Sequence, residues 1–402
     1  MKIAIIGGGP AGMMAGIIAS RHGQVSLFEK NEKLGKKLYI TGKGRCNITN
    51  NKDISEFFPA LVRNPEFLYS AFYQFTNQDL QDLIPLTFKV ERGDRVFPKS
   101  DKSSDVISAL EKMLREAGVQ VYKNTPVLDL EKKGHFLLKT KEGTQAFDRV
   151  ILATGGKSYP VTGSTGDGYG FAQKFGHSLV PLRGGLVGIL LKDSFVKDLE
   201  GLSLRNVSLK AQGDGKLSLF GEALFTGQGL SGPIALTMSS YINRWEKVDL
   251  VLDLKPGLTL EKLDQAILRD FQEGQNKEIQ TILAGRLPHR LVDVFLSVLD
   301  LDPHQKVNET TKAERRRLVE GMKNFPLHYG GLDKLDHAII TSGGVDVKEI
   351  DPSSMESKKV PGLYFCGEVL DLDALTGGYN LQIAFSTGHL AGESVGKGFE
   401  KS

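Results

Sequence analysis

Cysteine is nearly absent from this sequence, which contains only Cys46 and Cys366 among its 402 residues. Two cysteines so far apart exclude a disulfide framework, a CxxC redox pair and a cysteine-rich metal site. The eight histidines are scattered without the spacing of metal ligands, so we predict no metal site. We expect both thiols to be free in a reducing compartment.

Long apolar runs and an excess of charge are also missing. No run approaches the length of a membrane-spanning helix, and GGGP interrupts the short apolar N-terminus where a signal peptide would continue. We therefore expect a cytoplasmic protein with no membrane partner. The formal net charge of +3 favours no nucleic-acid surface. The basic run from Lys312 to Arg317 is interpreted as a solvated helix face, with an RNA-binding role as the alternative.

Glycine, by contrast, is abundant and opens the sequence in an informative pattern. The apolar run from Ile3 to Ile6 leads into GGGPAG, which places Gly7, Gly9 and Gly12 in GxGxxG register, and a second apolar run ends at Glu29. Strand, glycines, helix, strand and acid in this order predict a dinucleotide-binding βαβ unit. Gly7 permits a tight turn, Gly9 lets the backbone approach a pyrophosphate, and Gly12 lets the helix pack closely.

The pattern of strands and helices changes along the chain, and 402 residues suffice for two or more domains. Residues 1–187 predict the first part of a nucleotide-binding domain. Residues 188–255 consist of short strands with turn signals, typical of a small antiparallel barrel or sheet. Residues 256–323 are helical and highly charged, residues 324–340 contain a return strand, and residues 341–402 complete the first domain.

The C-terminal segment points to a flavin. A buried strand ends in Gly367-Glu368, and TGGYNLQ then opens the final helix near Asn380. An acid at a strand end can bind ribityl hydroxyls, and a helix N-terminus can stabilise the negative charge that a flavin ring gains on reduction. A nicotinamide has no comparable need. The alternative is that this strand and helix simply complete the sheet.

The motifs GGGPAG, TGKGRCNITN, ATGGKSYPVTGSTGDGYG, TSGGV and CGEVLDLDALTGGYNLQIAFSTG together resemble the BaiN-like flavoprotein family, which includes bacterial aminoacetone oxidases. The resemblance covers essentially the whole chain. It implies non-covalent FAD in an α/β, Rossmann-like FAD/NAD(P)-binding domain of the two-dinucleotide type, with an inserted small β-barrel and helical subdomain. Some relatives carry Trp in the GGYN block where this chain has Ile383, so their substrates cannot be carried over.

The resemblance also implies a set of cofactor-binding residues, in which the loop after the second strand wraps the cofactor. The expected residues are Gly7, Gly9, Ala11, Gly12, Glu29, Lys30, Lys37, Thr41, Gly42, Gly44, Arg45, Cys46, Asn47, Val127, Ala153, Thr154, Gly155, Gly367, Glu368, Asn380, Leu381 and Gln382. For Arg45 the alternative is a surface ion pair. For Cys46 we favour packing over redox chemistry, because the spacing supplies no resolving thiol or activating histidine.

The expected activity is that of an FAD-dependent oxidoreductase acting on a small molecule. Ser158, Tyr159 and Tyr379 are candidates to line the substrate pocket, and no residue is assigned as the proton donor. No second strand-GxGxxG-helix unit is present, so NADH or NADPH would dock transiently.

We predict an NAD(P)H-linked reductase of an unsaturated or carbonyl substrate, such as a steroid-like enone. The alternatives are an oxidase of a small amine, such as aminoacetone, that produces hydrogen peroxide, and a flavin-bound regulatory or RNA-associated protein. The oligomeric state is left open.

Overall fold

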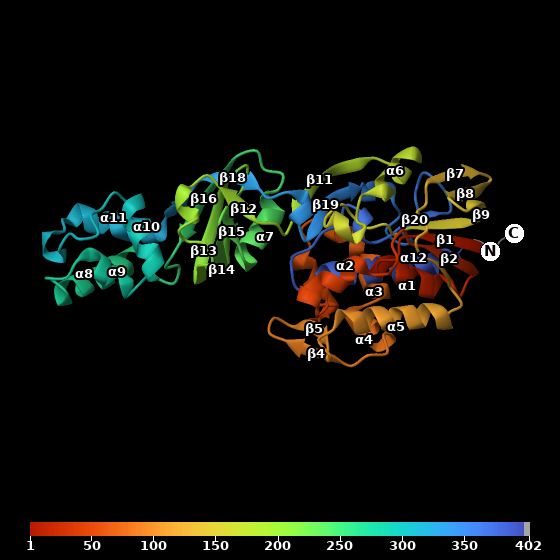
Figure 1. The fold of residues 1–402 in the computed structure, drawn as a ribbon, viewed down its shortest axis with the longest axis horizontal. Helices are drawn as coiled ribbons and strands as arrows, with labels where there is room; N and C mark the ends of the chain where they lie inside the picture. Colours follow the sequence, from red (N-terminus) through yellow and green to blue (C-terminus); the bar gives the residue numbers. More distant parts are fainter. Residues whose placement is uncertain (398–402) are drawn as a thin grey trace. The chain divides into compact units, whose positions relative to one another are not determined.

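The computed structural model describes residues 1–397, and its internal contacts divide the chain into two compact units (Figure 1). The first unit contains Met1–Gly185 and the chain from Leu335 onward, and the second is Leu186–Lys334. The second unit is therefore an insertion into the first. The sequence placed residues 335–340 in the return strand of the insert, but they belong to the first unit. Ile340 begins β19 (Ile340–Val345), which pairs with β11 (Leu179–Gly185) of that unit.

A five-stranded parallel sheet forms the centre of the first unit. Its strands are β1 (Lys2–Ile6), β2 (Gln24–Phe28), β6 (Gln120–Tyr122), β10 (Arg149–Leu152) and β20 (Leu363–Phe365), in the order β20-β10-β1-β2-β6. Four residues of β1 and four of β2 are buried, as expected for parallel strands covered on both faces. Read in chain order, the sheet is 3-2-1-4-5, and the predicted Rossmann-like α/β class is confirmed.

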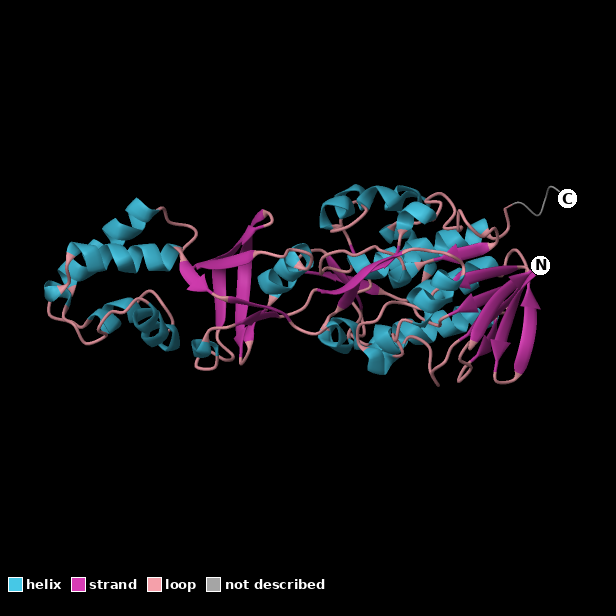
Figure 2. Ribbon diagram, turned by 90° about the horizontal axis from the view of Figure 1, so that it is seen from above, coloured by secondary structure: helices cyan, strands magenta, loops and turns pink. Residues whose placement is uncertain are grey.

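Different layers cover the two faces of this sheet (Figure 2). Helices α1 (Pro10–Ala19), α5 (Ser103–Glu116) and α12 (Tyr379–Ser394) pack together, with α1 against the strands. On the other side lies a three-stranded antiparallel sheet of β7 (Asp129–Lys133), β8 (His135–Thr140) and β9 (Gly143–Phe147). Phe28 of β2 meets Phe147 of β9 edge-on, with ring centroids 5.9 Å apart.

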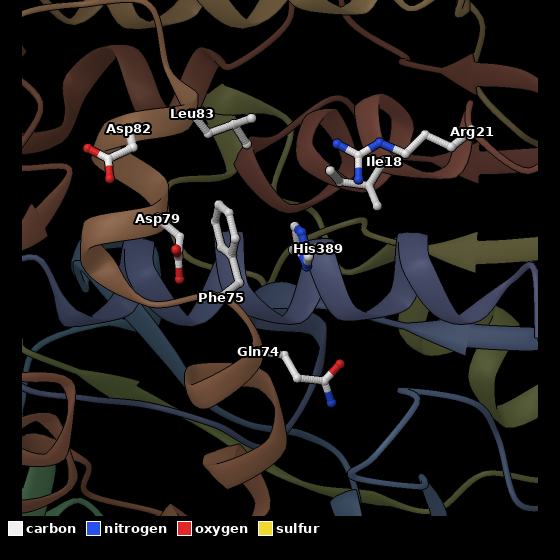
Figure 3. A pocket seen from close by; sticks show the side chains of 8 residues that line it. All are labelled: Ile18, Arg21, Gln74, Phe75, Asp79, Asp82, Leu83 and His389. Carbon is white, nitrogen blue, oxygen red and sulfur yellow. The ribbon is translucent and has the colours of Figure 1, made fainter.

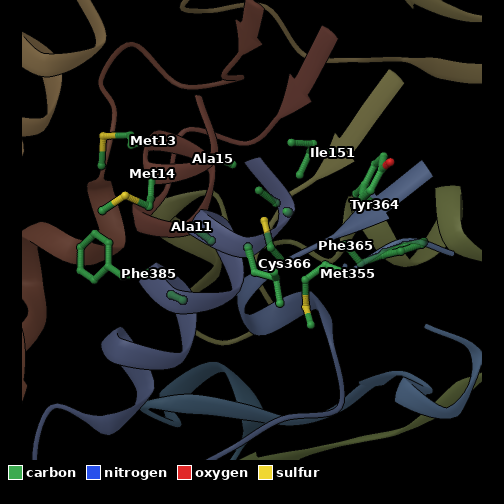
Figure 4. Close-up of a cluster of buried hydrophobic side chains, with 14 of the residues drawn as sticks. Ala11, Met13, Met14, Ala15, Ile151, Met355, Tyr364, Phe365, Cys366 and Phe385 are labelled. Atoms are coloured by element: carbon green, nitrogen blue, oxygen red, sulfur yellow. The ribbon is translucent and has the colours of Figure 1, made fainter. Parts of the chain in front are cut away.

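Small residues bring α1 and α12 into close contact. A Cβ atom added to Gly388 of α12 would lie 2.4 Å from the carbonyl oxygen of Ala11 in α1. Figure 4 shows the buried cluster around this contact, in which Met14 of α1, Phe385 of α12 and Cys366 after β20 lie together. The two helices and the last strand therefore share one core.

The remaining elements of the first unit are short. They are α2 (Lys36–Ile40), η1 (Thr41–Gly44), β3 (Thr49–Asn50), η2 (Ile54–Ala60), η3 (Pro65–Leu68), α3 (Tyr69–Gln74), α4 (Asn77–Leu83), β4 (Phe88–Glu91), β5 (Arg95–Pro98), η4 (Pro160–Thr162), α6 (Asp167–Lys174), η7 (Leu335–His337), η8 (Val347–Glu349) and η9 (Gly367–Val369).

The second unit has its own antiparallel sheet and its own apolar core. The sheet order is β17-β16-β13-β14-β15-β12-β18, with β12 (Ile189–Leu191), β13 (Ser203–Gly213), β14 (Lys216–Thr226), β15 (Gly229–Ser231), β16 (Val248–Asp253), β17 (Phe325–Leu327) and β18 (Tyr329–Leu332). Its helices are η5 (Ser194–Val196), α7 (Pro233–Ile242), α8 (Leu260–Glu273), α9 (Ile279–Ala284), α10 (His289–Val298), η6 (Val307–Glu309) and α11 (Lys312–Lys323). Only His328 separates β17 from β18, so one bent segment pairs with both edges and gives the sheet a barrel-like form.

A buried histidine anchors the loop between β19 and β20. His177 Nδ1 lies 3.0 Å from Glu349 Oε2, and its Nε2 lies 2.8 Å from Ser357 Oγ. The arrangement has the order of a catalytic triad, but Ser357 is buried and its Oγ accepts the N–H groups of Lys359 and Val360 at 3.0 and 2.8 Å. The serine oxygen is therefore engaged in holding the loop and has no open face for a substrate.

Burial lowers the pKa of His177 below its usual value of 6.5, so the ring is neutral in the folded protein at neutral pH. Burial raises the pKa of Glu349, but hydrogen bonds from Lys359 and Ser178 outweigh it and lower that pKa to about 2. Both groups therefore favour the folded state at neutral pH more than in acid.

We predict that the first unit loses stability on acidification in two steps. The contribution of His177 is present above pH 6.5 and is lost as pH falls through its depressed folded pKa. The contribution of Glu349 is lost only between about pH 4.5 and about pH 2. Thermal unfolding between pH 7.5 and 5 should therefore show a fall in Tm that is smaller in His177→Gln. An equal fall in Tm in the wild type and in His177→Gln would contradict the role given to His177. Glu349→Gln serves as the control, because it leaves the histidine titratable.

Candidate functional site

The glycine turn after β1 requires glycine at two of its three motif positions, and the third differs. Gly7 has φ = 108°, and a Cβ there would lie 2.4 Å from the carbonyl oxygen of Ala153. A Cβ on Gly12 would lie 1.9 Å from the carbonyl oxygen of Gly7. Gly9 differs, because its backbone is extended (φ −79°, ψ −177°) and no atom lies within 4 Å of an added Cβ. Nothing in the protein itself requires glycine at position 9, and the space beside it is open to a ligand.

Two helices among the expected cofactor-binding segments begin without a capping side chain. Helix α1 starts after Gly9 with Pro10 in its first turn, no side-chain cap and no acidic residue. Helix α12 starts after Gly378, also without a side-chain cap. The N–H groups of a first helical turn have no partner within the helix, and they carry the positive end of its dipole. Both starts are therefore suited to a negatively charged or electron-rich ligand.

Glu29 ends β2 beside the glycine turn, as the sequence predicts. Its buried carboxylate accepts the N–H of Gly8 at 2.8 Å and both the backbone and side-chain N–H groups of Asn31, at 2.8 and 2.7 Å. These bonds fix the acid at the strand end where a ribose would lie. Lys30 turns instead toward α6, donating to Asp167 at 2.6 Å and to Thr165.

Three of the expected residues, from three separate segments, meet in one ion-pair network. Lys37 Nζ of α2 donates to Ser158 Oγ at 2.7 Å and to the Glu368 carboxylate oxygens at 2.8 and 2.7 Å. Ser158 Oγ also donates to Glu368 Oε1 at 3.3 Å. Lys37 and Glu368 are mostly buried, with side chains 19% and 22% exposed, so solvent screens this pair less than a surface pair. The network thus joins two cofactor candidates, Lys37 before the insert and Glu368 after it, to the pocket candidate Ser158.

The loop of residues 41–47 behaves differently from the rest of the expected site. Arg45 donates from Nε to Asp101 at 2.7 Å and from its terminal nitrogen to Glu91, and its guanidinium lies 4.3 Å from the centre of the Phe97 ring. This is the ion pair that the sequence left as the alternative, and contact of Arg45 with a cofactor stays a prediction. Cys46 is fully buried, and burial raises the pKa of its thiol to about 12, which suits a packing role.

The other residues of this loop and of the strand ends are placed as follows. Thr41 Oγ1 donates to the Leu38 carbonyl at 2.7 Å, and a Cβ on Gly44 would meet no atom within 4 Å. Asn47, with its amide turned to satisfy both neighbours, donates to the Thr49 carbonyl and accepts the Gly378 N–H at 3.0 Å each. Further positions are the half-buried Val127 in the loop after β6, Ala153, Thr154 and Gly155 just after β10, Gly42 in the αL conformation, and Gly367, where a Cβ would lie 2.8 Å from Ala11 Cβ.

The first turn of α12 presents its backbone, while two of its side chains point inward. Asn380 Oδ1 accepts the Ala374 N–H at 2.9 Å, and Asn380 Nδ2 donates to the Ala374 carbonyl at 2.7 Å. Gln382 is fully buried and accepts from Thr49 Oγ1 at 2.7 Å. These amides hold the loop before the helix and strand β3. Contacts of this turn with a cofactor would therefore use the N–H groups of residues 379–381, including Leu381.

The pocket candidates lie in different surroundings. Ser158 is fully buried within the ion-pair network, and Tyr159 follows it with φ = 51°. The Tyr379 ring packs edge-on against Phe57 at 4.9 Å, in an aromatic cluster that includes Phe72. The structure thus brings Ser158 to Lys37 and Glu368, whereas Tyr379 packs in the aromatic cluster.

Sequence reasoning did not single out two buried residues of this region, Thr341 and Tyr169. Thr341 of β19 is fully buried and bonded to both Ser158 and Glu368. The buried Tyr169 hydroxyl has no hydrogen-bond partner among the described residues, and the same holds for the hydroxyl of Thr154, an expected cofactor-binding residue. Burial, followed by the charge of Glu368, raises the pKa of Tyr169. The TSGGV motif was visible in the sequence, but no spacing rule gave its threonine a role.

A separate pocket of about 380 Å³ opens at the far end of α1 (Figure 3). It is lined by Ile18, Arg21, Gln74, Phe75, Asp79, Asp82, Leu83 and His389. None of these residues belongs to the expected cofactor set, so the pocket lies outside the site described above. Within residues 1–397 no group of three metal-ligating side chains is found, and no helix is both long and apolar enough to cross a membrane.

The parallel sheet, the open glycine turn before α1 and the buried acid after β2 define a dinucleotide-binding fold of the kind that FAD-dependent oxidoreductases use. The fold is similar to that of 3-ketosteroid-delta4-(5alpha)-dehydrogenase from Rhodococcus jostii RHA1, with a TM-score of 0.52, 14% identity and coverage of 98% of this chain and 96% of the other.

The family follows from the sequence comparisons. The model described as HI0933-like protein Rossmann domain matches residues 1–394. The chain is 31% identical to 3-dehydro-bile acid delta(4,6)-reductase of Clostridium scindens, over 98% of each chain. It is also 31% identical to ribosomal RNA dihydrouridine synthase of Haemophilus influenzae, again over 98% of each. The chain belongs to the HI0933-like family of FAD-dependent oxidoreductases, and the predicted resemblance to BaiN-like flavoproteins is confirmed.

The glycine turn yields a paired mutational prediction. Gly9→Val should fold with unchanged Tm, because its backbone is extended and its Cβ is free, yet it should bind FAD about 100-fold more weakly, equivalent to about 2.8 kcal/mol. Gly12→Val should instead unfold the protein, since its Cβ would overlap the Gly7 carbonyl. Thermal unfolding and FAD titration of the apoprotein would check both. A yellow, fully loaded Gly9→Val protein would overturn the placement of the pyrophosphate.

Proposed function

We propose that this protein uses FAD to transfer a hydride from NADPH or NADH to a carbon–carbon double bond conjugated with a carbonyl group. The similarity to two relatives of different substrate class carries this proposal. One relative is named for reducing the delta(4,6) double bonds of a 3-oxo bile acid, and the other for forming dihydrouridine. In both, the double bond that is saturated stands next to a carbonyl group.

The residues present fit an FAD molecule. The open space at Gly9 and the first turn of α1 would receive the pyrophosphate, and Glu29 would accept the ribose hydroxyls. The unpartnered buried hydroxyl of Thr154 lies just after β10, at the edge of the sheet where α/β proteins bind ligands. Bound FAD would supply hydride transfer between donor and substrate.

The protein would contribute position and charge. The N-terminus of α12 would stabilise negative charge on the pyrimidine side of the flavin, because its first N–H groups carry no capping side chain. Lys37 would keep a positive charge near the strand ends, held by Glu368 and Ser158. Neither cysteine takes part, since both are buried and burial raises the pKa of both thiols.

A small unsaturated carbonyl compound is favoured over RNA as substrate. The relative named for dihydrouridine makes uridine in RNA the second candidate. RNA binding, however, relies on cations free to meet phosphates. In the basic run on α11, Arg315 pairs with Asp264 at 2.8 Å and Arg316 pairs with Glu320 at 2.7 Å. Part of the positive charge that suggested an RNA surface is therefore neutralised within the protein.

The proposal predicts the behaviour of the visible spectrum. Purified protein should show flavin bands that bleach when NADPH or NADH is added under anaerobic conditions, and a steroid-like enone should restore them. Bands that persist with both nucleotides, together with oxygen consumption in the presence of aminoacetone, would support the amine oxidase instead. Reoxidation by a uridine-containing ribosomal RNA fragment, and not by the enone, would favour the RNA substrate.

A further inference from the structure

Thr341 lies at the centre of the contacts that hold Lys37, Ser158 and Glu368 together. Its N–H donates to Glu368 Oε1 at 2.8 Å. Its Oγ1 accepts the N–H groups of Lys157 at 2.8 Å and of Ser158 at 3.1 Å. One fully buried residue thus links the loop after β10, through its side chain, to the acid after β20, through its backbone N–H.

The strand that carries Thr341 is itself fixed by close packing. β19 pairs antiparallel with β11, where Thr341 is opposite Gly184. A Cβ on Gly343 would lie 2.4 Å from the Pro181 carbonyl oxygen, and one on Gly344 would lie 2.6 Å from the Val369 carbonyl oxygen. The hydroxyl of Thr341 is therefore presented from a strand with little freedom to shift.

The loop after β10 passes Thr341 with no side chain between them. A Cβ on Gly156 would lie 2.3 Å from Thr341 Oγ1 and 2.9 Å from Glu368 Oε1. Two backbone N–H groups of this loop depend on one hydroxyl oxygen, and a buried N–H without a partner is strongly unfavourable. Removal of the hydroxyl should therefore release the loop and, with it, Ser158.

We propose that Thr341 is a positioning residue that fixes the Lys37–Glu368–Ser158 network in the geometry needed to bind and reduce FAD. The inference rests on the proposed function, in which this network lies at the flavin. Thr341 itself touches no reacting atom. It acts through Glu368, which it orients by its N–H, and through Ser158, which it places by its oxygen.

Two conservative substitutions separate this role from simple packing. Thr341→Val keeps the shape of the side chain and removes the hydroxyl, whereas Thr341→Ser keeps the hydroxyl and removes a methyl group. A positioning role predicts that Val is the damaging change and that Ser is close to wild type. A packing role predicts the reverse order, because Val fills the site and Ser leaves a small cavity. Ser342→Ala is a matched control on the same strand, since Ser342 bonds to Arg63 outside this network.

The first measurement is amide hydrogen exchange of residues 156–158 in the apoprotein, followed by FAD titration. In Thr341→Val the N–H groups of Lys157 and Ser158 both lose their acceptor, so we expect their exchange to accelerate at least about tenfold and FAD to bind about tenfold more weakly. In Thr341→Ser and Ser342→Ala both quantities should stay within about threefold of wild type.

The outcomes distinguish this inference from the proposed function. Unchanged exchange and FAD affinity in Thr341→Val, or a larger loss in Thr341→Ser, would overturn the positioning role. Failure of the wild-type flavin to bleach with NADPH and NADH would overturn the proposed reductase activity, while the exchange measurement on apoprotein would still decide the role of Thr341.

Discussion

The contact between helix α1 and the turn before it is the constraint on which the site depends. Gly12 lies directly under the Gly7 carbonyl, so α1 must begin immediately at the end of β1. Helix α12 packs on α1 at Gly388, where any side chain would overlap the carbonyl oxygen of Ala11. These contacts hold the start of α1 at the end of β1 and fix the middle of α12 beside it. Any residue larger than glycine at these contacts would move a binding surface.

Features that depend on local spacing could be predicted from the sequence. The glycine turn, the acid at the end of β2 and the start of the last helix could be predicted because each depends on residues that are close together in the sequence. Turn and helix signals are short-range. The Rossmann-like fold class followed from recognising that unit, since parallel βαβ connections restrict the topology. The fold class was therefore accessible from sequence, and part of the site with it.

Features that depend on distant partners could not be predicted in the same way. Lys37 and Glu368 are far apart in the chain, and no spacing rule connects them. Arg45 stands in a glycine-rich loop typical of phosphate contacts, yet Asp101 and Glu91 approach it from other segments. The inward orientation of the Gln382 amide follows from its bond to Thr49, which tertiary packing places there. In each case the residue could be identified from the sequence, whereas its hydrogen-bond partner depends on the tertiary structure.

The insert leaves the first unit after Gly185 and returns before Leu335. Its first residue follows β11 directly, residues 335–339 lead from its last residue to β19, and the two strands pair so that Gly185 stands opposite Ile340. The connection is therefore a hydrogen-bonded ribbon, and the parallel sheet is complete without any strand from the insert. Such a connection is modular, because the intervening segment can change in length or sequence while the ribbon closes the gap. A change of length or sequence in the insert would thus leave the glycine turn and the last helix of this chain in place.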